Sequence, residues 1–459
     1  MSIIRSYISA ITKAYIRAVI PGNGGASSAD SYWYGIEIDE ANSSPDVTRI
    51  ASDMTLHHAI TGLPCHQNIK GCLLADAGTV NYYLDPTDWS KKADGSASAR
   101  DGSNGQVMNE WGDFYYKVEN NYPAAGKHQI KISPYSGNGW VLVPKHYISA
   151  YQAGIQRSTS KLASVINTST DYRGGNNTSA WDSAANSLLG KPASNINRTN
   201  FRTYARNRGA GWNINSYSDY KWLFWFYVIE YATLNSQKAV NSDLTVDGYR
   251  QGGLGVGVTT ANSTEWNTFC AYNPFINCGA SDSLGNLSGE VSVTVTDFGG
   301  AGVNRTFAVP RYRGHENSFG HIWNILDGVN LEVQSVASGD LTKTWISDDP
   351  TTWNDENYTG YINVGNQARA SGYLKTALMG SGAEFVPSVT GSGADQTKYY
   401  CDYYYTSVPA SGVSLRMLIS GGYADAGILT GLTSSYANRV PSSASTDFGS
   451  RLAFIPGES

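Results

Sequence analysis

The stretch from Tyr423 to Asp447 has the residue types of a ligand-binding surface. Glycines permit tight turns and positive φ angles, so they fix the path of a loop whatever its neighbouring side chains are. Two of them lie within this stretch (Gly427 and Gly431), two directly precede it (Gly421 and Gly422), and Gly449 closes it. Between them lie tyrosines and small polar residues, which dominate antibody-like binding surfaces because Tyr gives large area at low entropic cost and Ser and Asn hydrogen-bond adaptably. The residues expected to contact a ligand are Tyr423, Asp425, Ala426, Leu429, Thr433, Ser434, Tyr436, Asn438, Arg439 and Ser445.

The same stretch lacks five residue types. Lys, Glu, Gln, Met and Trp do not occur between Tyr423 and Phe448, although Lys and Trp are frequent elsewhere in the chain. If mutations changed only the adenines of asparagine codons, none of the resulting codons would encode Lys, Glu, Gln, Met or Trp. The composition therefore supports a segment that is diversified at adenines, with an ordinary Gly/Ser-rich loop as the alternative.

Other residues with catalytic or metal-binding potential are scattered. His57, His58, Cys65, His66 and Cys72 lie close in sequence, but their spacing matches no standard metal site, so packing or surface exposure is favoured. The five cysteines form no CxxC pair and are expected to be mostly buried thiols.

Acidic pairs offer a second kind of chemistry. Asp85 with Asp88, or Asp348 with Asp349, could be the paired carboxylates of a glycosidase, although acidic pairs in polar loops are usually solvated. His315 and Glu316 are expected to hold a turn. We expect no cofactor; a structural Ca²⁺ ion would suit the Asp/Asn-rich loops, although no DxDxDG-type loop is present.

Short strands separated by turn signals must position these residues. YWYGIEI (32–38), CLLADAGTVNYYL (72–84), QIKISPY (129–135) and KHYISAYQAGI (145–155) predict strands, and DPTDWSKKADGSASARDGSNG (85–105) predicts an exposed loop. Residues 198–212 predict a short helix, and residues 218–240 give the strongest helix signal, apolar nearly all round and therefore buried. Apolar positions at 415–419 and 452–455 predict two strands that bring the ends of the diversified segment together, and Arg451 is expected to hydrogen-bond loop carbonyls.

The N-terminal sequence and the overall composition indicate which kinds of partner to expect. Apolar residues at near-helical spacing in residues 3–20 predict an amphipathic helix that docks on a partner or on copies of itself; a frayed terminus is the alternative. Lys13 and Arg17 interrupt this run too early for membrane insertion. A net charge of −5 without a visible basic patch gives no reason to expect a nucleic-acid partner.

Several strings resemble a known fold family. Residues 140–456 resemble the C-type-lectin-like fold of the formylglycine-generating enzyme family. The strings that carry the resemblance are KHYISAYQ (145–152), the helix with Trp222, Trp225, Ile229, Glu230, Tyr231 and Ala232, NSFGHIWNILD (317–327), SGG (420–422) and GSRL (449–452). The oxidases of that family need cysteines near the C-terminal part of the domain. Tyr423 to Phe448 is free of Cys and offers Cys401 no partner, so we expect a protein that is not an enzyme.

A narrower resemblance covers nearly the whole chain. YGIEIDEANSSPDVTRI, NYYLDPTDW, DGSNGQVMNEWGDFYYKVE, RTNFRTYARNRGAGW and RGHENSFGHIWNILDG resemble a widespread family of phage tail-fibre and prophage proteins, such as those of gut phages. Many members resemble the variable target proteins of diversity-generating retroelements. The resemblance implies that variants of the C-terminal segment carry host recognition.

Together these observations predict an α+β fold: an N-terminal helix and linker (1–30), a small β-rich module (31–139) and a large C-type-lectin-like domain (140–459) with its variable segment at 423–447. The expected function is binding of a host cell-surface protein or glycan by a phage tail-fibre protein. The protein would be made in the bacterial cytoplasm, carried in the virion with other tail proteins, and assembled as a homotrimer. The alternatives are a formylglycine-generating-type oxidase, a polysaccharide-degrading tail enzyme, and a structural tail or decoration protein.

Overall fold

The computed structural model describes residues 28–58, 62–241, 243–258 and 261–457. The amphipathic helix predicted at residues 3–20 lies outside the described residues.

The first part of the chain forms a five-stranded sheet. Its order is β2-β1-β7-β6-β8, and its neighbouring strands are antiparallel. The predicted strands at 32–38 and 129–135 are confirmed as its central pair. The strands are β1 (Tyr34–Asp39), β2 (Thr48–Ala51), β6 (Phe114–Asn120), β7 (Lys127–Ser133) and β8 (Val141–Val143).

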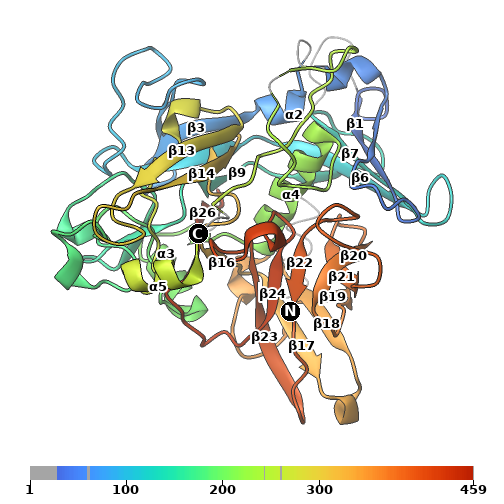
Figure 1. The fold of residues 1–459 in the computed structure, drawn as a ribbon. Coiled ribbons are helices and arrows are strands. Elements are labelled where there is room, and N and C mark those ends of the chain that lie inside the picture. Colours follow the sequence, from blue (N-terminus) through green and yellow to red (C-terminus); the bar gives the residue numbers. More distant parts are fainter. Residues whose placement is uncertain (1–27, 59–61, 242, 259–260, 458–459) are drawn as a thin grey trace.

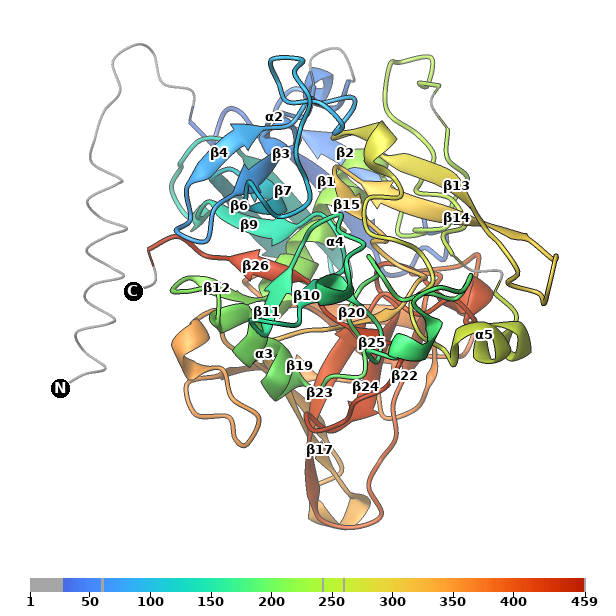
Figure 2. The ribbon, with the colours of Figure 1, turned by 90° about the vertical axis from the view of Figure 1, so that its left-hand side faces the viewer.

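A six-stranded sheet combines strands from early and late parts of the described chain. Its order is β12-β26-β9-β5-β3-β4, so strands from before and after residue 139 share one hydrogen-bonded sheet. Figure 2 shows β26, from the C-terminal end, between β9 and β12. The strands are β3 (Ile69–Leu74), β4 (Val80–Tyr83), β5 (Gln106–Trp111), β9 (His146–Ser149), β12 (Trp212–Ile214) and β26 (Leu452–Phe454).

A ten-stranded sheet forms the lower half of the view in Figure 1. Its main path is β19-β18-β17-β23-β24-β22-β20-β21, with β16 and β25 attached beside β23. The edge strands β19 and β21 approach each other, so the sheet nearly closes into a barrel. The strands are β16 (Trp323–Ile325), β17 (Val329–Gln334), β18 (Thr342–Ile346), β19 (Ile362–Asn366), β20 (Gly372–Met379), β21 (Phe385–Thr390), β22 (Tyr403–Tyr405), β23 (Val413–Ser420), β24 (Ser435–Arg439) and β25 (Phe448–Gly449).

Two smaller sheets and short helices complete the fold. The sheets are β10 (Gly154–Gln156) with β11 (Lys161–Ala163), and β13 (Gly289–Val295) with β14 (Arg305–Tyr312) and β15 (His315–Glu316). The α-helices are α2 (Pro64–Gln67), α3 (Arg198–Arg206), α4 (Tyr217–Tyr231) and α5 (Ser263–Cys270). Single-turn 3₁₀ helices are η1 (Met54–His57), η2 (Thr170–Tyr172), η3 (Ser179–Trp181), η4 (Asp282–Leu284), η5 (Val336–Ser338), η6 (Pro350–Thr352) and η7 (Gly427–Leu429).

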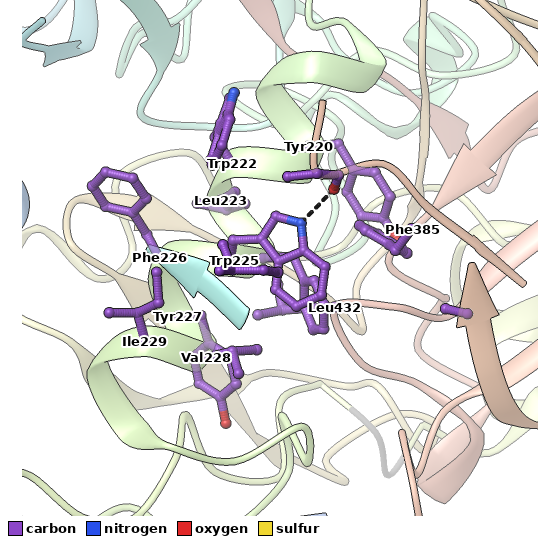
Figure 3. Close-up of a cluster of buried hydrophobic side chains, with 14 of the residues drawn as sticks. Tyr220, Trp222, Leu223, Trp225, Phe226, Tyr227, Val228, Ile229, Phe385 and Leu432 are labelled. Carbon is purple, nitrogen blue, oxygen red and sulfur yellow. Dashed lines mark hydrogen bonds between the residues drawn. The ribbon is translucent and has the colours of Figure 1, made fainter. Parts of the chain in front are cut away.

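Helix α4 is the centre of the main hydrophobic core (Figures 1 and 3). A capping box between Ser216 and Asp219 starts it, and Ala232 in the left-handed conformation ends it. Its apolar side chains point in all directions because sheets surround it, and Trp225 also donates its indole N–H to the carbonyl of Ala383 at 2.7 Å. The prediction of a buried helix here is confirmed, but the helix ends at Tyr231 rather than at 240.

The predicted α+β class is wrong, because the fold is mostly β. Strands make up 34% of the structure and helices 14%. The region after residue 252, in which Gly/Asn/Ser/Thr-rich stretches alternate with short strand-like runs, supplies every strand of the ten-stranded sheet. The strands there pair with partners that are distant in the sequence. A single segment of sequence therefore does not reveal them by its own alternation of apolar and polar residues.

Candidate ligand-binding face

Three neighbouring strands place four tyrosines on one face of the ten-stranded sheet. Successive side chains of a strand point to opposite faces, so Tyr403 and Tyr405 share one face of β22, and Tyr404 points to the other, where it is buried. Tyr373 of β20 is the register partner of Tyr403, and Tyr436 of β24 is the partner of Tyr405. Register partners have neighbouring side chains, and successive ring centroids here lie 5.4, 4.6 and 5.5 Å apart.

A fifth tyrosine joins this row through a buried indole. Trp323 of β16 stacks between Tyr423 and Tyr436, with centroids 5.7 and 5.6 Å from its own and interplanar angles of 26°. Offset stacking of this kind stabilises aromatic groups beyond their burial. We call Tyr373, Tyr403, Tyr405, Tyr423 and Tyr436 the aromatic face.

The hydroxyl groups of the aromatic face have no hydrogen-bond partner among the described residues. All five side chains are half-buried. The hydroxyl of the neighbouring Tyr404, on the opposite face of β22, is in contrast bonded to Gln367 at 2.6 Å. Burial raises the pKa of Tyr405 and Tyr423, so both hydroxyls stay protonated at neutral pH. The face therefore offers rigid rings with free donors and acceptors.

The remaining predicted contact residues divide into two groups. Asp425, Ala426, Leu429, Asn438 and Ser445 are half-buried and Arg439 is exposed, with its guanidinium carbon 5.2 Å from the Tyr436 ring centroid. Thr433 and Ser434, in contrast, are buried, and their hydroxyls donate to the Asp402 carboxylate at 2.7 Å and to the Tyr403 carbonyl at 3.2 Å. The structure thus brings Tyr423, Tyr436 and Arg439 to the surface, and places Thr433 and Ser434 beneath it.

Residues outside 423–447 hold the backbone of this segment. Gln237 donates to the carbonyls of Gly427 and Thr430, and the Ser236 hydroxyl accepts from the amide of Leu432 at 2.8 Å. Asp402 accepts from the amide of Thr433 at 2.8 Å. A Cβ at Gly431 would overlap the Asp402 carboxylate, which explains the glycine at that position. Most of these bonds reach main-chain atoms, so they do not depend on the outward side chains.

Asp402 is expected to make stability depend on pH. Burial raises its pKa from 3.8 to about 7, more than the bonds from Thr433 and Ser434 lower it. The folded protein therefore keeps a proton that the unfolded chain has released between these two values, and stability falls as pH rises through this window. Above pH 7 the carboxylate is ionised in both the folded and the unfolded chain, so its destabilising effect on the free energy of unfolding no longer changes with pH.

An Asp402→Asn variant tests this dependence. The difference in free energy of unfolding between wild type and variant should change between pH 4 and pH 7 in favour of the variant, and should be flat above that range. Denaturant titrations at a series of pH values measure it. A difference that is independent of pH would show that Asp402 ionises normally.

Sequence reasoning missed three tyrosines of the face and its central indole. Tyr373, Tyr403, Tyr405 and Trp323 lie outside 423–447, and only pairing between distant strands brings them there. One signal was available, because YYCDYYY (399–405) concentrates tyrosines, and aromatic side chains are enriched in strands.

The other chemical candidates are bonded within the fold. His66 bonds the Tyr34 hydroxyl and the Phe226 carbonyl, both at 2.8 Å, and Glu316 accepts from Gly279 and Ser281, which confirms its expected role in a turn. The five cysteines are free and buried, as predicted. Within the described part of the chain, no three His, Cys, Asp or Glu side chains form a group able to hold a metal ion. None of the helices in the described ranges is long and apolar enough to cross a membrane.

Comparison of the sequence with protein-family models and with curated proteins finds no match.

Proposed function

We propose that the chain is a receptor-binding tail-fibre protein that contacts a host cell-surface ligand through the aromatic face and the adjoining variable segment. The observation that carries this proposal is the row of five half-buried tyrosines whose hydroxyls are unbonded. Stacked rings lose little conformational freedom on binding, and free hydroxyls can hydrogen-bond to a partner.

The hydrogen bonds that hold the backbone of the variable segment support the proposal that its outward side chains vary. Gln237, Ser236 and Asp402 hold the backbone between Gly427 and Ser434, so outward positions such as Asp425 and Arg439 can change without loosening the loop. This arrangement suits a surface whose contact residues vary while its path stays fixed. The resemblance to retroelement target proteins points in the same direction.

As a tail-fibre protein the chain would be a homotrimer in the virion, attached to other tail proteins and bound to a host protein or glycan, because repeated sites multiply weak contacts into avidity. Burial of Cys401 raises its thiol pKa, which disfavours the reactive thiolate that an oxidase would need and supports a role in binding rather than catalysis.

Removing the hydroxyls tests this function. A variant with Tyr403, Tyr405 and Tyr436 changed to Phe keeps the rings, and its binding to sensitive bacterial cells should fall about tenfold or more, since each lost hydrogen bond costs about 1 kcal/mol. Cell binding by fluorescently labelled protein measures this. Stability should be unchanged because these hydroxyls bond no described residue.

A matched control changes two tyrosines outside the face. Tyr122→Phe with Tyr135→Phe alters exposed rings of the N-terminal part and should leave cell binding intact. Equal binding by wild type and the triple variant would contradict the proposal and favour a decoration protein. Degradation of host capsular polysaccharide, or oxidation of a Cys-containing peptide, by the purified chain would instead favour one of the enzymes.

A further inference from the structure

A second cleft lies between the five-stranded sheet and the ten-stranded sheet. It consists of two adjoining cavities of about 200 and about 710 Å³ that share Tyr116, Val141 and Asp348 in their walls. None of the residues lining either cavity belongs to the aromatic face. The larger cavity is within the size range of small-molecule sites.

Tyr116 gives this cleft an unused hydrogen-bonding group. Its side chain is 8% exposed, and its ring packs against Trp222 with centroids 4.7 Å apart. Its hydroxyl bonds to no described residue, although it lines both cavities. Burial, and then the nearby Glu384 and Asp348, raise its pKa, so the hydroxyl is a donor at neutral pH. A buried tyrosine hydroxyl normally has a partner, and here the cleft is where one can sit.

The acidic pair Asp348–Asp349 separates into two roles. Asp349 caps η6 through the amide and hydroxyl of Thr351, at 3.0 and 2.6 Å. Asp348 is exposed in both cavities and makes no hydrogen bond or ion pair with the described residues. Within this pair, the Asp349 carboxylate is therefore occupied by the cap, and the Asp348 carboxylate stays available to a ligand.

The charges of the lining disfavour anionic ligands in both cavities and, in the smaller cavity, oppose cationic ligands as well. Carboxylates of Asp219, Asp348, Asp349 and Glu384 would repel an anion. A cation would meet Lys145 and Lys221 in the smaller cavity. Aromatic and aliphatic walls alternate with polar groups, among them Trp222, Trp353, Ile362, Asn363, Ser218 and Ser381. A neutral ligand with apolar C–H faces and several hydroxyls matches this lining, because carboxylates and amides accept from its hydroxyls.

We propose that this cleft binds a neutral sugar, with the Tyr116 hydroxyl and the Asp348 carboxylate as its principal hydrogen-bonding groups. The site is separate from the aromatic face and gives the protein a second binding function. Because the two cavities adjoin and are open to solvent, the cleft has room for a sugar that belongs to a longer glycan.

Titration of the full-length protein with single sugars tests the proposal. The probes are D-glucose, D-galactose, D-mannose and N-acetyl-D-glucosamine, with saturation-transfer NMR to detect binding and calorimetry to measure affinity. At least one should bind with millimolar affinity. Tyr116→Phe and Asp348→Asn should each weaken that binding about tenfold, since the first removes a hydrogen-bonding hydroxyl and the second replaces a charged acceptor with a neutral amide.

Two matched substitutions locate the binding. Tyr405→Phe on the aromatic face and Asp247→Asn at an exposed position outside the cleft should leave the sugar affinity unchanged. Binding of none of the four sugars would overturn the proposal. Equal affinity in wild type, Tyr116→Phe and Asp348→Asn, or a loss confined to Tyr405→Phe, would overturn it as well.

Discussion

Replacing Trp323 with alanine is expected to lower the free energy of unfolding by about 3–5 kcal/mol and to abolish binding at the aromatic face. The indole is 2% exposed and belongs to a core cluster with Met417, Ile419 and Phe448. Its removal leaves a cavity between Tyr423 and Tyr436, which then lose the ring on which both are stacked. The two effects are linked because the same side chain fills the core and orders the surface.

Chemical denaturation and cell binding measure the two effects. Trp345→Ala is the control, since that half-buried indole stacks on Tyr358 in another part of the sheet and should cost less stability with no change in binding. Trp323→Phe restores one aromatic ring and should recover part of both losses. Full binding by Trp323→Ala under conditions where it is folded would show that stacking on Trp323 does not order the face.

Local sequence signals predicted the elements that need no distant partner. Helix α4 has a capping serine, an acidic residue at its third position and fifteen residues without Gly or Pro, so its existence follows from the sequence. Its end does not, because Ala232 adopts a left-handed conformation that gives no residue-type signal. Strands β1, β7, β23 and β26 were also predictable. However, β23 and β26 lie in different sheets and do not pair with each other.

The sequence predicted only those residues of the aromatic face that lie close together in the chain. The glycines and tyrosines of 423–447 indicate a surface segment, and Tyr423 and Tyr436 do lie together. Thr433 and Ser434 have the same residue types as surface contacts, but they are buried and bonded to Asp402 and to the Tyr403 carbonyl, partners that are distant in the sequence. Tyr373, Tyr403 and Tyr405 needed the register of three strands that are distant in sequence, and the sequence does not state that register.

Replacing Arg451 with methionine is expected to cost about 3–5 kcal/mol of stability, comparable to the loss of a buried ion-pair partner. The sequence predicted that Arg451 bonds loop carbonyls, and this is confirmed: its guanidinium donates to Ser149 and Ala150 at 3.3 Å, to Asn317 at 2.9 Å and to Glu316. The side chain is 3% exposed, so methionine would leave four buried carbonyl oxygens without this donor.

An Arg451→Lys variant shows whether the charge of the side chain or the geometry of its hydrogen bonds stabilises the fold. Arg451→Lys keeps the charge, but one ammonium group cannot reproduce the planar fork that reaches two chain segments, so most of the loss should remain. Arg439→Met changes an exposed arginine and should alter stability by no more than about 0.5 kcal/mol. Urea titrations of the three variants provide the comparison. A loss below about 1 kcal/mol in Arg451→Met would mean that water replaces the guanidinium, and that the C-terminal strand closes the fold without it.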